Sequence, residues 1–261
     1  FQAEDAIRDR DVTGVQTCAL PILNDNSTTG DVYTTAVGND NNAGTAAAPF
    51  ATIGKAIQVA QAGNTIKVDA GTYAENVTVN KAVNVLGPNY NVSPNGGART
   101  AEAIIVPAST NTSSGAAVTI TSGSVQFQGF TVDGDNASLA SSGVGLGGSL
   151  GASIDAARTI FLNANGITNV SITKNIAKNA VNGIRIEQTT NYFSTTAGAL
   201  RSYNILINDN KVQDMTGTGI RLGNSMYAKV TNNTVTNADN GIAFSSFRIS
   251  DAGNEIGRAH V

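Results

Sequence analysis

Hydrophobic residues follow two different periods along this chain. In the segment PFATIGKAIQVAQAG, apolar residues recur at i, i+3, i+4 and i+7 from Ile53, the spacing of one face of an α-helix. Thr52 stands where an N-cap is expected, and Gly63 is a suitable C-terminal stop. The sequence therefore predicts a short helix near 51–61.

Outside this segment, apolar and polar residues alternate in short runs separated by glycine, asparagine or proline. This pattern is typical of β-strands. Strands this short and evenly spaced fit either a sandwich or a solenoid. The predicted strands are 32–36 before the helix and, after it, 65–68, 76–79, 83–87, 103–106, 117–120 and 125–132.

Three later segments repeat one pattern, which favours the solenoid. They are 169–186, 204–222 and 228–244, and each contains a Gly-Ile pair. The glycines of the last two pairs are 22 residues apart (241 − 219 = 22), which is one coil. The first two are 36 apart (219 − 183 = 36), one coil plus an insertion of about 14 within 187–204. The aligned columns are Ile172/Ile207/Val230, Ala177/Val212/Val235, Ile184/Ile220/Ile242, Ile186/Leu222/Phe244 and, at a turn, Asn175/Asn210/Asn233.

We therefore predict an all-β fold, a right-handed parallel β-helix along most of 65–250. The helix near 51–61 would cover the first coil, whose backbone is otherwise unpaired. Alternation within strands places Ile184 and Ile220 inside. It leaves Arg185 and Arg221 outside, on adjacent coils.

The two ends of the chain differ from the middle. Residues 1–22 contain the only cysteine, and 255–261 contain the only histidine. The strings QAEDAIRD and VTGVQTCALPI near the start, and EIGRAHV at the end, resemble in-frame translations of short-read sequencing adapters. We interpret 1–22 and 255–261 as adapter-like artefacts. The remainder, 23–254, is then a single β-helix domain from a metagenomic fragment, truncated at its C-terminal end.

The composition of this middle part excludes several function classes. It has no Cys, His or Trp, so mechanisms that need a histidine or a thiolate are excluded. Lys and Arg number 16 − 3 = 13 and Asp and Glu 19 − 5 = 14, which leaves a net charge of −1. Such a chain lacks the basic surface of a nucleic-acid binder. No apolar run reaches the ~20 residues that span a bilayer.

Several motifs resemble the N-terminal cap and first coil of pectin-lyase-like right-handed β-helix proteins. They are PFATI at 49–53, GNTIKV at 63–68 and GTYAENV at 71–77, and the resemblance covers roughly 31–254. Asn64 stands where that superfamily most often has Asp. The resemblance implies the fold, a secreted or cell-surface location and a monomeric module of a larger protein such as an adhesin. It does not specify an activity.

Enzymes of that superfamily use recognisable groups. Galacturonase-like hydrolases need clustered aspartates and a histidine, and the histidine is absent. Pectate-lyase-like enzymes need Ca²⁺-binding carboxylates beside an arginine base, and the columns of Arg185 and Arg221 hold no such cluster. We therefore predict no catalytic residue here. The alternative is a polysaccharide lyase or hydrolase whose active site lies mostly in missing coils. An ice-binding face would need T-x-T ladders, and these do not recur from coil to coil.

Two pairs of residues are candidates for binding. Asp133 and Asp135, followed by a Gly/Ser-rich loop, could bind sugar hydroxyls or Ca²⁺, although Asp, Gly and Asn are also ordinary turn residues. Apart from this Ca²⁺, the sequence predicts no cofactor. Arg185 and Arg221 could bind an acidic glycan, or they could be a solvated stripe. The predicted function is a secreted or cell-surface module, glycan-binding or structural and adhesive, with polysaccharide or cell-surface glycan as partner.

Overall fold

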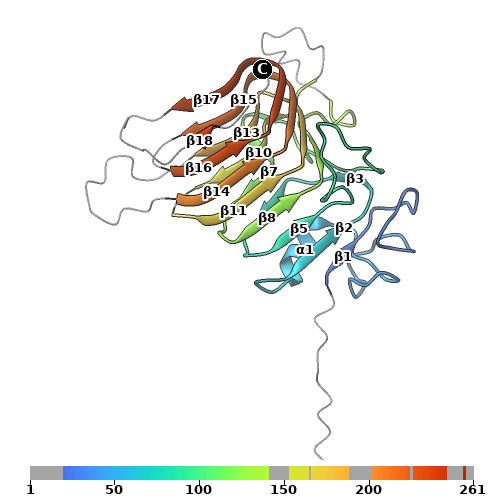
Figure 1. Cartoon of the computed structure of the whole chain (residues 1–261). Helices are drawn as coiled ribbons and strands as arrows, with labels where there is room; N and C mark the ends of the chain where they lie inside the picture. Colours follow the sequence, from blue (N-terminus) through green and yellow to red (C-terminus); the bar gives the residue numbers. More distant parts are fainter. Residues whose placement is uncertain are drawn as a thin grey trace, which may run out of the picture.

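The fold is a parallel β-helix, as predicted. The computed structural model describes residues 20–140, 153–164, 166–187, 202–223, 226–245 and 255–256. Coils stack from β1 at one end of the molecule to β17 and β18 at the other (Figure 1). The strands of neighbouring coils pair in parallel. Parallel crossovers are right-handed in nearly all proteins, which is the predicted hand.

The first sheet takes one short strand from each coil. Its residues pair with their equivalents one coil away: Ile172 with Ile207, and Ile207 with Val230. The predicted column at these positions is therefore confirmed. Among the described residues its strands, in pairing order, are β1 (Ile22–Leu23), β2 (Thr65–Val68), β5 (Asn84–Leu86), β8 (Val125–Gln128), β11 (Thr168–Thr173), β14 (Ser202–Asn208), β16 (Met226–Thr231) and β18 (Glu255–Ile256).

The second sheet bends at a corner and makes two walls. β15 spans both, because its first part pairs with β12 and its last part with β13. With the first sheet, these walls surround the core on three sides. Among the described residues its strands are β3 (Gly71–Ala74), β6 (Ala103–Val106), β9 (Thr131–Asp133), β12 (Ile176–Ala180), β15 (Lys211–Gly223), β13 (Asn182–Glu187), β10 (Ala156–Asn163), β7 (Asn111–Ile120) and β4 (Val77–Val79), with β17 (Thr234–Ser245) paired to β15.

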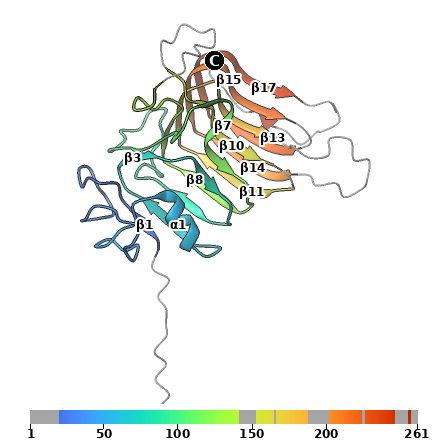
Figure 2. The same ribbon diagram turned by 180° about the vertical axis from the view of Figure 1, so that it is seen from behind.

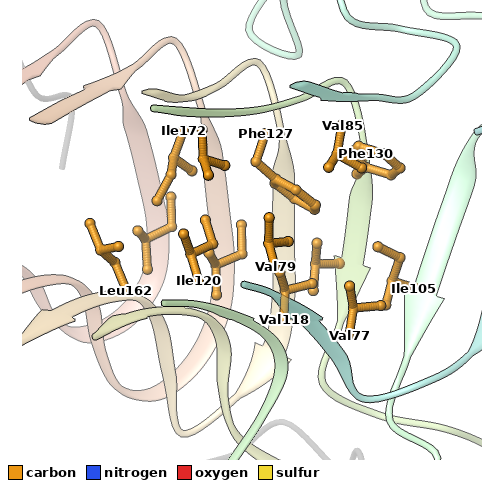
Figure 3. Packing of buried hydrophobic residues seen from close by; sticks show 14 of the residues in the cluster. Val77, Val79, Val85, Ile105, Val118, Ile120, Phe127, Phe130, Leu162 and Ile172 are labelled. Atoms are coloured by element: carbon orange, nitrogen blue, oxygen red, sulfur yellow. The ribbon is translucent and has the colours of Figure 1, made fainter. Parts of the chain in front are cut away.

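Apolar side chains stacked one coil apart fill the interior. Val79 pairs with Ile120, and Ile120 pairs with Leu162, and all three are fully buried (Figure 3). Opposite them, the rings of Phe127 and Phe130 stack with centroids 4.6 Å apart. Each buried aliphatic side chain contributes about 1.5–3 kcal/mol. Small aliphatic residues therefore suffice, because the core is narrow.

Buried asparagines connect successive coils at the turn between the first sheet and the second. The side-chain oxygen of Asn210 accepts the backbone N–H of Asn175 at 3.0 Å, and that of Asn233 accepts the backbone N–H of Asn210 at 2.9 Å. The amide of Asn210 also donates to the carbonyl oxygen of Ile172 at 2.9 Å. The predicted alignment of the three asparagines at a turn is confirmed, and we call them the asparagine ladder.

The helix α1 (Ile53–Val59) lies at the β1 end of the solenoid (Figure 2). The side chain of Thr52 accepts the N–H of Lys55, so Thr52 is the predicted N-cap. The carboxylate of Glu75, which follows β3, accepts the N–H groups of Ile53 and Gly54 at 2.8 and 3.0 Å. These bonds satisfy amides that have no partner within the helix and attach it to the first coil.

The end of the helix differs from the prediction. Its C-cap is Ala60, and Gly63 lies three residues further along the chain. The amine of Lys81 donates to the carbonyl oxygens of Gln58 and Ala60, at 2.6 and 2.9 Å. A lysine side chain from the solenoid thus donates to the last carbonyl groups of the helix, and the helix ends before the predicted glycine.

One strand prediction is wrong, and another is wrong in part. Residues 32–36 form no strand, because the carboxylate of Asp69 accepts three successive backbone N–H groups there, those of Val32, Tyr33 and Thr34. The predicted strand 125–132 is divided into β8 and β9. Gly129 has φ +81°, and a Cβ there would lie 2.2 Å from the backbone nitrogen of Tyr90, so the chain turns at this glycine.

Both boundaries of the interpreted β-helix domain lie beside paired strands. Ile22 pairs with Lys67, and Glu255 pairs with Lys229. The interpretation of 1–22 and 255–261 as adapter-like artefacts stays a prediction, and most of both segments lies outside the described residues. The insertion predicted within 187–204 falls between β13 and β14, where 188–201 also lie outside them.

Replacing Ile220 with Asp should prevent folding, whereas replacing the next residue, Arg221, with Ala should change stability little. Ile220 is fully buried between Ile184 and Ile242, so the substitution would put an unpaired carboxylate in an apolar stack. Thermal unfolding followed by circular dichroism measures both effects. Equal effects would mean that the assignment of inner and outer faces is wrong by one residue.

Candidate anion-binding site

Arg185 and Arg221 lie side by side on the outer face of the last wall. They are paired residues of β13 and β15, and both are half-buried. Ile184 and Ile220, one residue before each of them, are fully buried. The predicted outward positions on adjacent coils are therefore confirmed.

A third arginine, Arg158 of β10, joins this pair. Its guanidinium carbon lies 4.5 Å from the centroid of the Phe161 ring. Phe161 is the cross-strand partner of Arg185, which in turn pairs with Arg221. The side chain of Arg158 thus reaches the column of the other two, and three successive coils each bring a guanidinium group to it. We call Arg158, Arg185 and Arg221 the arginine cluster.

Sequence reasoning missed Arg158 because it predicted no strand between 132 and 169, and β10 also begins irregularly. Ile160 and Leu162 face inward and are fully buried, so strict alternation would also turn Arg158 inward. The register of β10 against β7 shifts between Ala156 and Arg158. Arg158 is nevertheless half-buried, and its Nη1 donates to the carbonyl oxygen of Ser114 at 2.8 Å.

Several hydrogen-bond donors of the arginine cluster have no acceptor. The Nε atoms of Arg158 and Arg185 are buried and without a hydrogen-bond partner. A buried donor without an acceptor costs about 1–3 kcal/mol. Among the described residues, the ion pairs do not include Arg221. The two Nε atoms are themselves closed to solvent, so a ligand that supplies oxygen atoms would meet the outer parts of these half-buried side chains.

The charges in the cluster also oppose one another. The pKa of Arg158 is lowered, first by burial and then by the positive charges of Arg185 and Arg221. The carboxylate of Glu187 acts in the opposite direction and raises this pKa. Because arginine stays protonated in proteins, this repulsion is not relieved by loss of a proton. A bound anion would relieve it.

Glu187 brings a negative charge next to the cluster. Its Oε2 atom lies 2.8 Å from Nη2 of Arg185, and both side chains are mostly buried, with 23% and 17% of their surface exposed. Glu187 follows Arg185 by two residues in β13, so the two side chains share a face. That spacing was visible in the sequence, although it was not used there.

Asp133 and Asp135 belong to a different group of charges, at the corner after β9. Asp133 lies 2.9 Å from the amine of Lys178 and accepts the amide of Asn179 at 2.9 Å. Burial raises the pKa of Asp135, and the charges of Asp133 and Asp155 raise it further. Asp133 ends β9 and pairs with Lys178 of β12, whereas Arg185 and Arg221 lie on the other wall, in β13 and the last part of β15, so the two predicted pairs belong to different walls.

The corner itself has the geometry of a turn. The carboxylate of Asp133 accepts the backbone N–H of Asp135 at 3.1 Å. Asp155, fully buried, accepts the N–H of Asn136 at 2.9 Å and the hydroxyl of Thr110. The Gly/Ser-rich segment 141–152 lies outside the described residues. Within the described part, no group of three or more His, Cys, Asp or Glu side chains is placed to hold a metal ion.

Comparison with known proteins gives one family. The family described as "Protein of unknown function (DUF1565)" matches residues 36–259. The chain belongs to this family. The match includes α1 and all three arginines of the cluster. No curated protein and no solved structure matches the chain. In the part of the chain that the structure describes, no helix is long and apolar enough to cross a membrane.

Asp135→Asn should raise the melting temperature at about pH 7 and leave it unchanged at about pH 3. The pKa of Asp135 is raised in the folded state, so ionisation of this group opposes folding at neutral pH. Below the ordinary value of 3.8 it is protonated in both states, and the gain disappears. Asp133→Asn, which removes the partner of Lys178, is the control and should lower the melting temperature at pH 7. An equal change in both variants would contradict the assignment.

Proposed function

We propose that this chain is a secreted or cell-surface β-helix module that binds acidic polysaccharide through the arginine cluster. The observation that carries the proposal is the positive charge gathered there by three neighbouring coils. Two buried Nε donors lack acceptors, and three positive charges lie on adjacent coils beside one carboxylate. Arginine matches the geometry of carboxylate and sulfate groups, to which it can donate two parallel hydrogen bonds.

A polymer suits this arrangement better than a small anion does. Neighbouring coils are separated by the strand spacing of about 4.8 Å, which is close to the length of one pyranose unit in a chain. An acidic polysaccharide lying across β10, β13 and β15 would bring about one charged sugar to each coil. Several weak contacts would then add up along one molecule.

We also propose that the fold belongs to the pectin-lyase-like superfamily. Residues of the motifs that suggested this resemblance have defined structural roles. Thr52 caps α1, and Glu75 holds the first amides of that helix against the solenoid. A secreted or cell-surface location, with a structural or adhesive role in a larger protein, is part of the same proposal.

The double variant Arg185→Ala, Arg221→Ala should bind an acidic oligosaccharide at least about tenfold more weakly than the unaltered protein, because charge-assisted hydrogen bonds each contribute more than neutral ones. Isothermal titration with a galacturonic acid hexamer measures this loss. The control is Lys55→Ala, Lys211→Ala, which removes the same charge from α1 and from the first part of β15. Equal losses would mean that only net charge matters. If the unaltered protein does not bind the hexamer, glycan binding is contradicted and a structural role as a spacer is favoured.

The purified chain should show no turnover of pectate or alginate in the presence of Ca²⁺. General acid–base catalysis needs a positioned group with a suitable pKa, and the strongest acidic candidates are engaged in the turn after β9. Absorbance of unsaturated uronate products follows the reaction. A steady rise that is lost in Asp133→Asn or Asp135→Asn would instead favour the alternative, a polysaccharide lyase.

A further inference from the structure

The ion pair between Arg185 and Glu187 occupies part of the arginine cluster. Glu187 uses Nη2 of Arg185, so one of the donors that could meet a ligand already has a carboxylate 2.8 Å away. The Nε atom of the same arginine remains buried and unpaired. Arg158 and Arg221 form no ion pair among the described residues. The cluster is thus partly occupied by a group from the chain itself.

We propose that Glu187 is a resident anion that an acidic polysaccharide must displace, and that it makes the site selective for polymers over single acidic sugars. This inference rests on the proposed function. A free sugar carboxylate that takes the place of Glu187 exchanges one ion pair for another and gains little. A polymer gains more, because its neighbouring charges meet Arg221 and Arg158 while one of its carboxylates replaces Glu187.

The following coil does not hold the Glu187 side chain in place. Its neighbour on the following coil is Gly223, which has no side chain to hold it in place. The pair lies on the outer face of the wall, and 23% of the surface of the Glu187 side chain is exposed. A polymer that displaces Glu187 gives up one ion pair and makes several new contacts in exchange.

The test is the variant Glu187→Gln, which keeps the shape of the side chain and removes its charge. Binding of galacturonic acid monomer, trimer and hexamer is measured by isothermal titration at low ionic strength. We expect the monomer and trimer to bind about five- to tenfold more tightly to the variant than to the unaltered protein. The hexamer should gain less, so that the preference for polymers is reduced.

The matched control is Glu102→Gln. Glu102 pairs with Arg99 at 2.6 Å, with side-chain exposures of 22% and 9%, so the control removes the same charge from a similar pair outside the cluster. It should leave all three affinities unchanged. Equal tightening in both variants would overturn the proposal, because net charge alone would then explain it.

Two further outcomes separate this inference from the proposed function. In the first, the unaltered protein binds the hexamer, and Glu187→Gln leaves the affinity for the monomer and trimer unchanged. The proposal that Glu187 must be displaced is then wrong, whereas the proposed binding site is supported. If neither protein binds any of the three sugars, the proposed function fails, and this inference fails with it. Glu187→Ala is the second variant, used if the glutamine variant does not fold, and the same affinities decide.

Discussion

Buried hydrogen bonds between the asparagines of successive coils fix the register on which the rest of the molecule depends. Each oxygen of the asparagine ladder accepts a backbone N–H from the neighbouring coil, so one coil cannot shift against the next without leaving buried donors unpaired. A shift of one residue would also exchange the two faces of every strand. Ile220 would then face solvent, and Arg221 would enter the core.

This register explains how a chain with few bulky residues presents a charged site. Because every coil repeats the same turn, outward positions of neighbouring coils come into one column, and residues far apart in sequence become neighbours. The segment between β13 and β14 does not disturb the column, since Arg185 still pairs directly with Arg221. The solenoid supplies a rigid surface, and a few outward residues decide what it binds.

The sequence predicted the repeating parts of this structure better than the irregular ones. Apolar columns and the asparagine ladder follow from a period of about 22 residues, which is visible in the chain. The carboxylate of Asp69 accepts the backbone N–H groups of residues 32–34, which lie more than 30 residues earlier in the chain. Such a contact leaves no periodic signal in the sequence. Arg158 was missed because no strand was predicted between 132 and 169, and a register shift at the start of β10 interrupts the alternation there. A local irregularity of this kind accompanies Arg158 alone, whereas Arg185 and Arg221 follow the regular alternation.

Nitrogen NMR of the arginine side chains tests the central claim most directly, since it observes the unsatisfied donors themselves. On titration with a galacturonic acid hexamer, the Nε–H signals of Arg158 and Arg185 should shift together and reach saturation. The signal of Arg99, whose Nε already donates to Glu102 at 2.6 Å, should stay in place. Saturable binding that leaves the Arg158 and Arg185 signals unchanged, or moves Arg99 equally, would contradict the account.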